Sequence, residues 1–356
     1  MKNTNAPHRA KSLTTAKALI ESELIEKKQF KAIESVVKKY ALNIPNHMLT
    51  LIDKHNTSDP IAKQVVPSSN ELIQKNNEFS DPIGDEKHSP VEGIVHRYKD
   101  RVLFKLNSAC AVYCRFCFRR EMVGPGKNQL KQNEIDKAVD YIKSHKEIWE
   151  VILTGGDPLI LSPAKIQRLI SQINKISHVK ILRVHTRVPI AAPHLINENL
   201  IKAIISSKKT IYISIHINHE REISEKTVKI CKLLSENGIA LVGQTVLLKG
   251  VNDDTDVLEK LFRKMMENRI LPYYLHHPDL AKGTSHFSVS ISHGQEIMKK
   301  LRGSVSGLAL PNYMLDIPGG YGKVPLTPNH IMQNKKNSVI IEDVHGITHE
   351  YPPKTQ

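Results

Sequence analysis

From residue 100 onward, short segments rich in β-branched residues alternate with segments of helical periodicity. The expected strands are 101–107, 150–155, 180–186, 210–217, 240–248 and 271–277, and the expected helices are 134–146, 163–176, 197–207, 224–238, 256–268 and 294–303. Strands that alternate with helices of this length predict a parallel sheet with helical crossovers. Six such units favour an α/β fold, a partial (β/α)6 barrel, although a doubly wound sheet would give the same pattern. In both folds the active site lies at the C-terminal ends of the strands.

The part of the chain before residue 96 has a different pattern. Residues 14–42 carry apolar side chains at helical spacing, residues 45–53 suggest a second short helix, and turn-rich connectors follow. We therefore expect three parts: a helical N-terminal region (1–95), the partial barrel (96–300) and a C-terminal segment (301–356).

Three of the four cysteines lie together. Cys110, Cys114 and Cys117 form a C-x3-C-x2-C pattern just after the first expected strand of the barrel. A structural zinc site needs four ligands, usually as two separated pairs, and no second pair is present. The fourth cysteine, Cys231, falls on the expected buried face of a helix and is interpreted as a core residue. Three thiolates without a fourth suit an iron–sulfur cluster with one iron open to another ligand.

The net charge and the placement of the cysteines limit the classes of function that this protein can have. The formal net charge is +15, but the lysines are scattered along amphipathic segments and form no basic tract. A solvated basic surface is the simpler interpretation, and an RNA-associated protein with a structural cluster is the non-enzyme alternative. Clustered rather than paired cysteines indicate a reducing compartment, and we find neither a signal-peptide pattern nor a long apolar run. We expect a cytoplasmic protein with no membrane or nucleic-acid partner.

The cysteine spacing and "TGGDP" (154–158) resemble the radical S-adenosylmethionine (SAM) superfamily. In that superfamily three cysteines hold a [4Fe–4S] cluster whose open iron binds SAM. The resemblance implies a radical SAM barrel and assigns SAM contacts to Phe116, Gly155, Gly156, Asp157 and His216. From the residues alone, "GGDP" would be an ordinary turn, and His216 could be a satisfied histidine at a strand end.

Further stretches are similar to the lysine 2,3-aminomutase family, from about residue 40 to the C-terminus. They are "HRYKDRVLF", "CRFCFRR", "GQTVLLKGVND", "PYYLHHPDLAKGTSHF" and "LDIPGGYGKVPLTPNH". The resemblance implies an isomerase, an L-lysine 2,3-aminomutase that interconverts L-α-lysine and β-lysine through a 5′-deoxyadenosyl radical acting on a pyridoxal 5′-phosphate (PLP) aldimine. The alternatives keep this chemistry but serve β-lysylation of elongation factor P, or act on glutamate or arginine.

The resemblance also assigns residues to PLP. Lys323 matches the catalytic lysine that condenses with PLP, which requires an amine close to the cofactor, as a glycine-rich turn permits. Arg97 and Arg101 match the phosphate-binding arginines, whose planar forks suit phosphate. Gln244 matches a neutral donor to PLP, and Tyr98 a residue beside its ring.

Three further residues match the substrate site. Arg119 matches the arginine that binds the substrate carboxylate, although a basic residue there could instead tune the cluster. Asp279 and Asp316 match the pair that binds the distal ammonium, and two converging carboxylates would offset the cost of desolvating that charge. Without the resemblance, each aspartate would be interpreted as an ordinary turn residue.

The chain departs from family members that bind structural zinc. It has no cysteine after Cys231, and Asp254 stands where one zinc-ligand cysteine would fall. We therefore predict a [4Fe–4S] cluster, SAM and PLP but no zinc. The expected partners are L-lysine, a reductant such as flavodoxin or ferredoxin, and further copies of the chain in a homo-oligomer.

Overall fold

A nine-stranded sheet forms the centre of the protein, whose computed structural model describes residues 12–124, 129–334 and 338–353. The strands lie side by side in chain order. They are β1 (Ile94–Tyr98), β2 (Arg101–Asn107), β3 (Glu150–Gly155), β4 (Ile181–Thr186), β5 (Thr210–His216), β6 (Ala240–Val246), β7 (Ile270–His276), β8 (Asn312–Ile317) and β9 (Gly322–Pro325). The pairs from β2 to β8 are parallel, whereas β1–β2 and β8–β9 are antiparallel.

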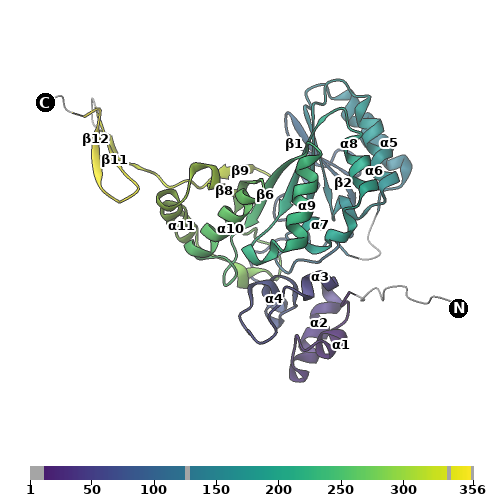
Figure 1. Cartoon of the computed structure of the whole chain (residues 1–356), viewed down its shortest axis with the longest axis horizontal. Coiled ribbons are helices and arrows are strands. Elements are labelled where there is room, and N and C mark those ends of the chain that lie inside the picture. The colour runs from purple at the N-terminus through teal and green to yellow at the C-terminus, as the bar shows by residue number, and fades with distance from the viewer. Residues whose placement is uncertain (1–11, 125–128, 335–337, 354–356) are drawn as a thin grey trace.

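Helices connect the parallel strands on the outside of the sheet (Figure 1). They are α5 (Gln132–Ser144), α6 (Pro163–Asn174), α7 (Val188–Ala191), α8 (Glu198–Ile205), α9 (Glu225–Glu236), α10 (Thr255–Glu267) and α11 (Ile291–Ser304). The six expected strands and six expected helices are confirmed. Strict chain order of the strands, without a reversal point, identifies the partial barrel and excludes the doubly wound sheet.

The sequence explains why these elements form. Strand β3 is buried along most of its length, as expected of a parallel strand covered on both faces. Helix α8 buries Leu200, Ile201 and Ile204 on one face, and the Asn197 side chain caps its N-terminus by accepting a hydrogen bond from the backbone N–H of Leu200. One continuous apolar core joins these helices to the sheet.

The N-terminal region is helical, as predicted, and lies below the barrel in Figure 1. Its helices are α1 (Ala16–Glu21), α2 (Phe30–Lys39), α3 (Asn46–Leu49) and α4 (Pro60–Val65), with 3-10 turns η1 (Lys27–Gln29), η2 (Ser69–Leu72) and η3 (Glu86–His88). The single apolar pattern over 14–42 divides into two helices because Glu23 adopts a left-handed conformation, φ +60°, that no α-helix continues.

Several strands were not predicted. Strand β1 precedes the barrel, β8 and β9 follow it, and a small antiparallel sheet ends the described chain: β10 (Ile331–Asn334), β11 (Val339–Glu342) and β12 (Thr348–Tyr351). This sheet stands apart from the barrel in Figure 1, and Lys299 of α11 contacts it through an ion pair with Glu342 at 2.8 Å. Among the described residues, no helix is both long and apolar enough to cross a membrane.

Candidate active site

A cavity of about 370 Å³ opens at the C-terminal ends of the strands. Its wall includes every residue to which the sequence assigned a role in binding or catalysis. These residues are Arg97, Tyr98, Arg101, Cys110, Cys114, Phe116, Cys117, Arg119, Gly155, Gly156, Asp157, His216, Gln244, Asp279, Asp316 and Lys323. Residues separated by more than two hundred positions in the chain therefore face one space.

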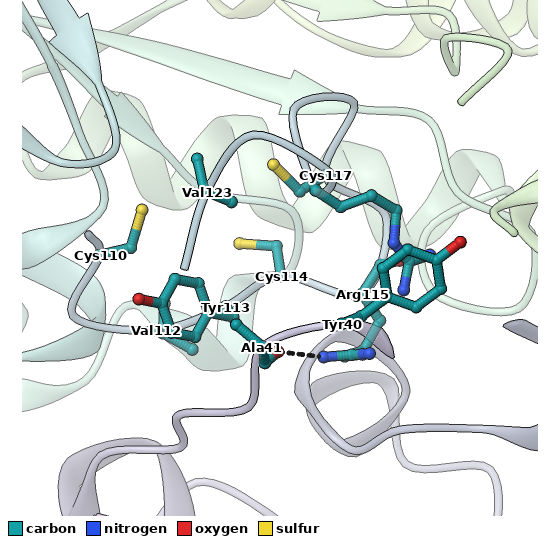
Figure 2. A pocket seen from close by; sticks show the side chains of 10 residues that line it. Tyr40, Ala41, Cys110, Val112, Tyr113, Cys114, Arg115, Cys117 and Val123 are labelled. Atoms are coloured by element: carbon teal, nitrogen blue, oxygen red, sulfur yellow. Dashed lines mark hydrogen bonds between the residues drawn. The ribbon is translucent and has the colours of Figure 1, made fainter. Parts of the chain in front are cut away.

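The loop that carries the three cysteines follows β2. In Figure 2 the sulfur atoms of Cys110, Cys114 and Cys117 face a common space, and Tyr40 and Ala41 of the N-terminal region line the same small pocket. No three His, Cys, Asp or Glu side chains among the described residues converge closely enough to hold one metal ion. Three thiolates that face one space are the donor set that a [4Fe–4S] cluster uses, with each thiolate bound to a different iron.

Burial changes the acidity of these thiols. Burial is the main cause that raises the pKa of Cys110 well above the ordinary value and that of Cys117 to about 11, with smaller contributions from Asp157 at Cys110 and from the neighbouring cysteines at both. Ionised thiolates at these positions therefore need a compensating positive charge, which bound iron supplies.

The glycine-rich stretch after β3 packs directly against the cysteine loop. A Cβ on Gly156 would lie 2.1 Å from the backbone O of Ala109, so no other residue fits there. The backbone N–H of Asp157 donates to that same Ala109 carbonyl at 2.8 Å. Close backbone contact of this kind holds the glycine stretch beside the cysteines.

The Asp157 carboxylate is engaged by the protein itself. It accepts hydrogen bonds from the Thr186 hydroxyl at 2.7 Å and from the backbone N–H groups of Leu159 at 3.0 Å and Arg187 at 2.7 Å. Burial raises the pKa of Asp157 above its ordinary value. Its side chain thereby joins the loops that follow β3 and β4.

Phe116 and His216 form an aromatic contact on the same side of the cavity. Their ring centroids lie 5.5 Å apart at 62°, and Phe287 supports Phe116 from behind at 6.0 Å. Burial lowers the pKa of His216 to about 3, so its imidazole is neutral. Its Nε2 atom is buried and has no hydrogen-bond partner among the described residues, which leaves it available to a bound ligand.

Lys323 lies at the opposite side of the cavity, in the β8–β9 hairpin. It pairs in register with Asp316, and its Nζ donates to that carboxylate. Arg97 Nη1 donates to the other oxygen of Asp316 at 2.8 Å, and the backbone N–H of Lys323 donates to the Tyr98 hydroxyl at 2.8 Å. These side-chain contacts link β1 to β9, the two edges of the sheet.

The residues that would hold PLP surround Lys323. The Arg101 guanidinium lies 3.9 Å from the centre of the Tyr98 ring and binds Asp100 at 2.7 Å. Two arginine side chains, an aromatic ring and a lysine amine in one cavity fit a cofactor that carries a phosphate, a ring and an aldehyde. The residues present therefore suit PLP.

Gln244 connects two histidines that the sequence analysis did not identify. Its Nε2 donates to Ser214 Oγ at 2.5 Å and lies 3.1 Å from His185 Nε2, and its Oε1 lies 3.2 Å from His276 Nε2. Burial lowers the pKa of both histidines well below the ordinary value, so both are neutral. Their positions at the ends of β4 and β7 are the sequence signal that could have identified them.

The substrate residues predicted from the sequence differ in their surroundings. Arg119 donates to Asp85 Oδ2 through Nε at 2.9 Å and Nη2 at 2.7 Å, which fixes the guanidinium and leaves Nη1 outside this fork. Burial raises the pKa of Asp279 to about 7, a value that includes the opposing effect of Lys323 and a smaller upward effect of Asp316. A cation placed beside this carboxyl would favour its ionised form.

Two family models match the chain. The model described as "Radical SAM superfamily" matches residues 105–261, which include the three cysteines and the glycine-rich stretch. The model described as "Lysine-2,3-aminomutase" matches residues 298–356, which include Asp316 and Lys323.

Several named proteins are similar over most of the chain. The L-lysine 2,3-aminomutase of Methanococcus maripaludis is 42% identical over 327 residues, 92% of this chain and 75% of that protein. The L-lysine 2,3-aminomutase of Clostridium subterminale is 35% identical, over 92% of this chain and 78% of that protein. The glutamate 2,3-aminomutase of Clostridioides difficile is 33% identical, over 94% and 79%.

These matches agree with the site geometry. Radical SAM proteins use SAM and a [4Fe–4S] cluster and need a reductant, and the aminomutase relatives imply PLP. The cavity brings together groups suited to all three. The chain belongs to the lysine 2,3-aminomutase family of the radical SAM superfamily, a family of isomerases.

Proposed function

We propose that this protein is an L-lysine 2,3-aminomutase that interconverts L-α-lysine and β-lysine. The observation that carries the proposal is that three thiols and the Lys323 amine face one cavity of about 370 Å³. A cavity of this size lies within the range of small-molecule binding sites. The names and coverage of the relatives support the same substrate class.

In this proposal Cys110, Cys114 and Cys117 hold the cluster, and Lys323 holds PLP. When bound, the cluster with SAM supplies a hydrogen-abstracting radical, and PLP supplies a ring system that stabilises the substrate while its amino group moves from C2 to C3. The chain's own residues bind and orient these groups and exclude water from them.

The remaining side chains position the substrate. Arg119, fixed by Asp85, would bind the α-carboxylate of lysine through its remaining N–H groups. Asp279 and Asp316 would share the distal ammonium, which compensates the cost of removing that charge from water. Two carboxylates at this end of the cavity would repel the distal carboxylate of glutamate, so lysine is favoured over glutamate.

Two further properties belong to the proposal. A flavodoxin- or ferredoxin-type protein would supply the electron, and the chain would act as a homo-oligomer. We further propose that the three parts expected from the sequence divide the work: residues 96–300 hold the cluster and SAM, and residues 301–356 supply Lys323 and Asp316.

The test is an anaerobic assay of the reconstituted protein with SAM, PLP, dithionite and either lysine or glutamate. We expect β-lysine from lysine and no β-glutamate, with a cluster absorbance that Cys117→Ala abolishes. Cys231→Ala is the matched control because Cys231 is fully buried and does not line the cavity, so this variant should keep both cluster and activity. Turnover of glutamate but not lysine would reject the proposed substrate, and activity in Cys117→Ala would reject the cluster assignment.

A further inference from the structure

Arg187, which follows β4, contacts one of the three cysteines. Its Nη1 donates to the sulfur of Cys114 at 2.7 Å. The two residues are 73 positions apart in the chain, so the contact depends on the fold rather than on the cysteine motif. Arg187 also lies beside Phe116, with its guanidinium carbon 5.6 Å from the ring centre.

The guanidinium is fixed from the side opposite Cys114. Its Nη2 donates to Gln64 Oε1 at 2.7 Å and to Glu222 Oε2 at 2.8 Å. The side chain of Arg187 is 6% exposed and that of Glu222 is not exposed at all. Separating a buried ion pair of this kind is energetically costly, so the Arg187 guanidinium stays in one orientation and its Nη1 points at Cys114.

The partners of Arg187 are themselves held in place. Gln64 Nε2 donates to Glu222 Oε1 at 3.0 Å, and Asn218 Nδ2 donates to Gln64 Oε1 at 2.9 Å. The backbone N–H groups of Asn218 and His219 donate to Glu222 at 3.0 and 2.9 Å. Gln64 belongs to α4 of the N-terminal region and Glu222 to the loop after β5, so two separate parts of the fold orient Arg187 toward Cys114.

We propose that Arg187 is a positioning residue that sets the reduction potential of the cluster held by Cys114. This inference rests on the proposed function, because it requires the cysteines to bind the cluster. Reduction adds one electron, and therefore negative charge, to the cluster and its thiolates. A cationic donor to a ligating sulfur stabilises that reduced form, and hydrogen bonds to the sulfurs are among the factors that set cluster potentials. The Arg187 side chain is 6% exposed and Cys114 is half-buried, so the charge acts on the sulfur through a medium less polar than bulk water.

A purely structural role for Arg187 predicts a different result. A cross-link between α4, β4 and the cysteine loop would affect stability and cluster loading, but would not change the potential of the clusters that remain. The midpoint potential therefore distinguishes the two roles.

The experiment is an EPR-monitored redox titration of the anaerobically reconstituted holoenzyme, with iron and sulfide measured on the same samples. Arg187→Gln, combined with Glu222→Gln so that no buried carboxylate loses its partner, should make reduction at least tenfold less favourable. For a one-electron couple that is a fall of about 59 mV. Arg187→Lys, which keeps the charge but cannot keep all three contacts, should lie between the parent and the double variant.

The matched control is Arg221→Gln. Arg221 also joins the N-terminal region to the barrel, through Asp59 at 2.6 Å and the Leu51 carbonyl at 2.6 Å, but its partners include no cysteine. Its variant should keep the parent potential.

The possible outcomes separate this inference from the proposed function. A parent protein that reconstitutes no cluster would reject the proposed function. A parent and an Arg187 variant that both carry the cluster at the same potential would overturn the inference and leave the function standing. If the double variant does not load iron, the loaded Arg187→Lys protein decides: a lower potential supports the inference, and the parent potential overturns it.

Discussion

Asp316 binds two cations at once: one carboxylate oxygen accepts from Arg97 Nη1 at 2.8 Å, and the other accepts from Lys323 Nζ. In the proposed enzyme Arg97 and Lys323 bind PLP, whereas Asp316 binds the distal ammonium of the substrate. With PLP bound, Lys323 would be held by the cofactor, and the Asp316 carboxylate that it now occupies would be available to the distal ammonium of lysine. We therefore expect binding of the cofactor and binding of the substrate to depend on the same residue.

Asp316→Asn should consequently affect both PLP and lysine. Truncating one partner of a buried charged pair costs roughly 3–5 kcal/mol, and each 1.4 kcal/mol or so is a factor of ten in rate. We expect kcat/KM for lysine to fall by about two to three orders of magnitude, together with a change in PLP affinity measured by absorbance titration. Asp279→Asn should lower kcat/KM similarly but leave PLP affinity unchanged. Equal PLP affinities in both variants and the parent would contradict the coupling.

The pH dependence of kcat/KM for lysine should follow the ionisation of Asp279. Burial raises the pKa of this carboxyl to about 7, so in the free enzyme it is protonated below pH 7 and ionised above it. Only the ionised form attracts the distal ammonium, so kcat/KM for lysine should rise with pH through about 7. Asp279→Asn should remove that rise. A parent profile that is flat or falls across this range would contradict the prediction.

Borohydride reduction should attach PLP to Lys323. Peptide mapping of the reduced holoenzyme is expected to place the pyridoxyl group on the peptide that contains "DIPGGYGK", and Lys323→Arg should abolish the label. Lys87→Arg is the control because Lys87 donates to the carbonyl of Gly319 in the same turn but is exposed. A label on another lysine would reject the PLP assignment and leave a radical SAM protein without this cofactor.

Glu71→Gln should destabilise the protein through the cysteine loop. Glu71 is fully buried in η2 and binds Arg115 at 2.5 Å and also Arg120, the residues that flank Cys117. We expect the free energy of unfolding at neutral pH to fall by roughly 3–5 kcal/mol in urea denaturation. Glu34→Gln is the control, because the Glu34–Lys38 pair at 3.1 Å is exposed and should contribute less than about 1 kcal/mol.

The sign of the pH effect on this ion pair follows from its pKa. Burial alone would raise the pKa of Glu71, but Arg115 and Arg120 outweigh burial and hold the pKa below its ordinary value of 4.5. The stabilisation is therefore complete above pH 4.5 and is lost as pH falls through the lower pKa of the folded state. The difference between the parent and Glu71→Gln should shrink over that acidic range, and a difference independent of pH would show that the ionised pair is not its source.

Metal analysis should find iron and no stoichiometric zinc. Asp254, which stands where the family resemblance would place a zinc-ligand cysteine, caps α10 by accepting from the backbone N–H groups of Asp256 at 2.9 Å and Val257 at 3.2 Å. Asp254→Ala should cost about 1 kcal/mol of stability, as for other helix caps, without changing the metal content. Asn197→Ala, which removes the equivalent cap of α8, is the control. One zinc per chain that Asp254→Ala removes would contradict this prediction.

Local sequence patterns were sufficient for the repeating part of the fold. Strands β2 to β7 and their helices have β-branched runs and helical periodicity that depend only on near neighbours. Strand β1 contains His96 and Arg97 and lies at the sheet edge. Strands β10 and β12 expose most of their side chains, and those of β11 are only half-buried, so none of these strands alternates between buried and exposed residues.

The site was predictable residue by residue but not as a set of contacts. Motifs assigned Arg97, Arg119 and Asp316 individually, whereas the pairs Arg97–Asp316 and Arg119–Asp85 join positions that no local pattern relates. The contact between Arg187 and Cys114 likewise joins two positions that no local pattern relates. Such pairs arise from strand order and register, which are properties of the folded sheet.

The pairing of Arg115 with Glu71 and of Arg187 with Gln64 limits how this enzyme can be shortened. A recombinant fragment that starts at β1 would retain these guanidinium groups and lose Glu71 and Gln64, their partners. Charged groups beside the cysteines would then be buried without a partner or exposed to solvent. The smallest soluble catalytic fragment must begin before residue 59, where α4 is capped by Asp59. For library design or transfer into another host, the N-terminal region belongs to the catalytic unit and is not an exchangeable module.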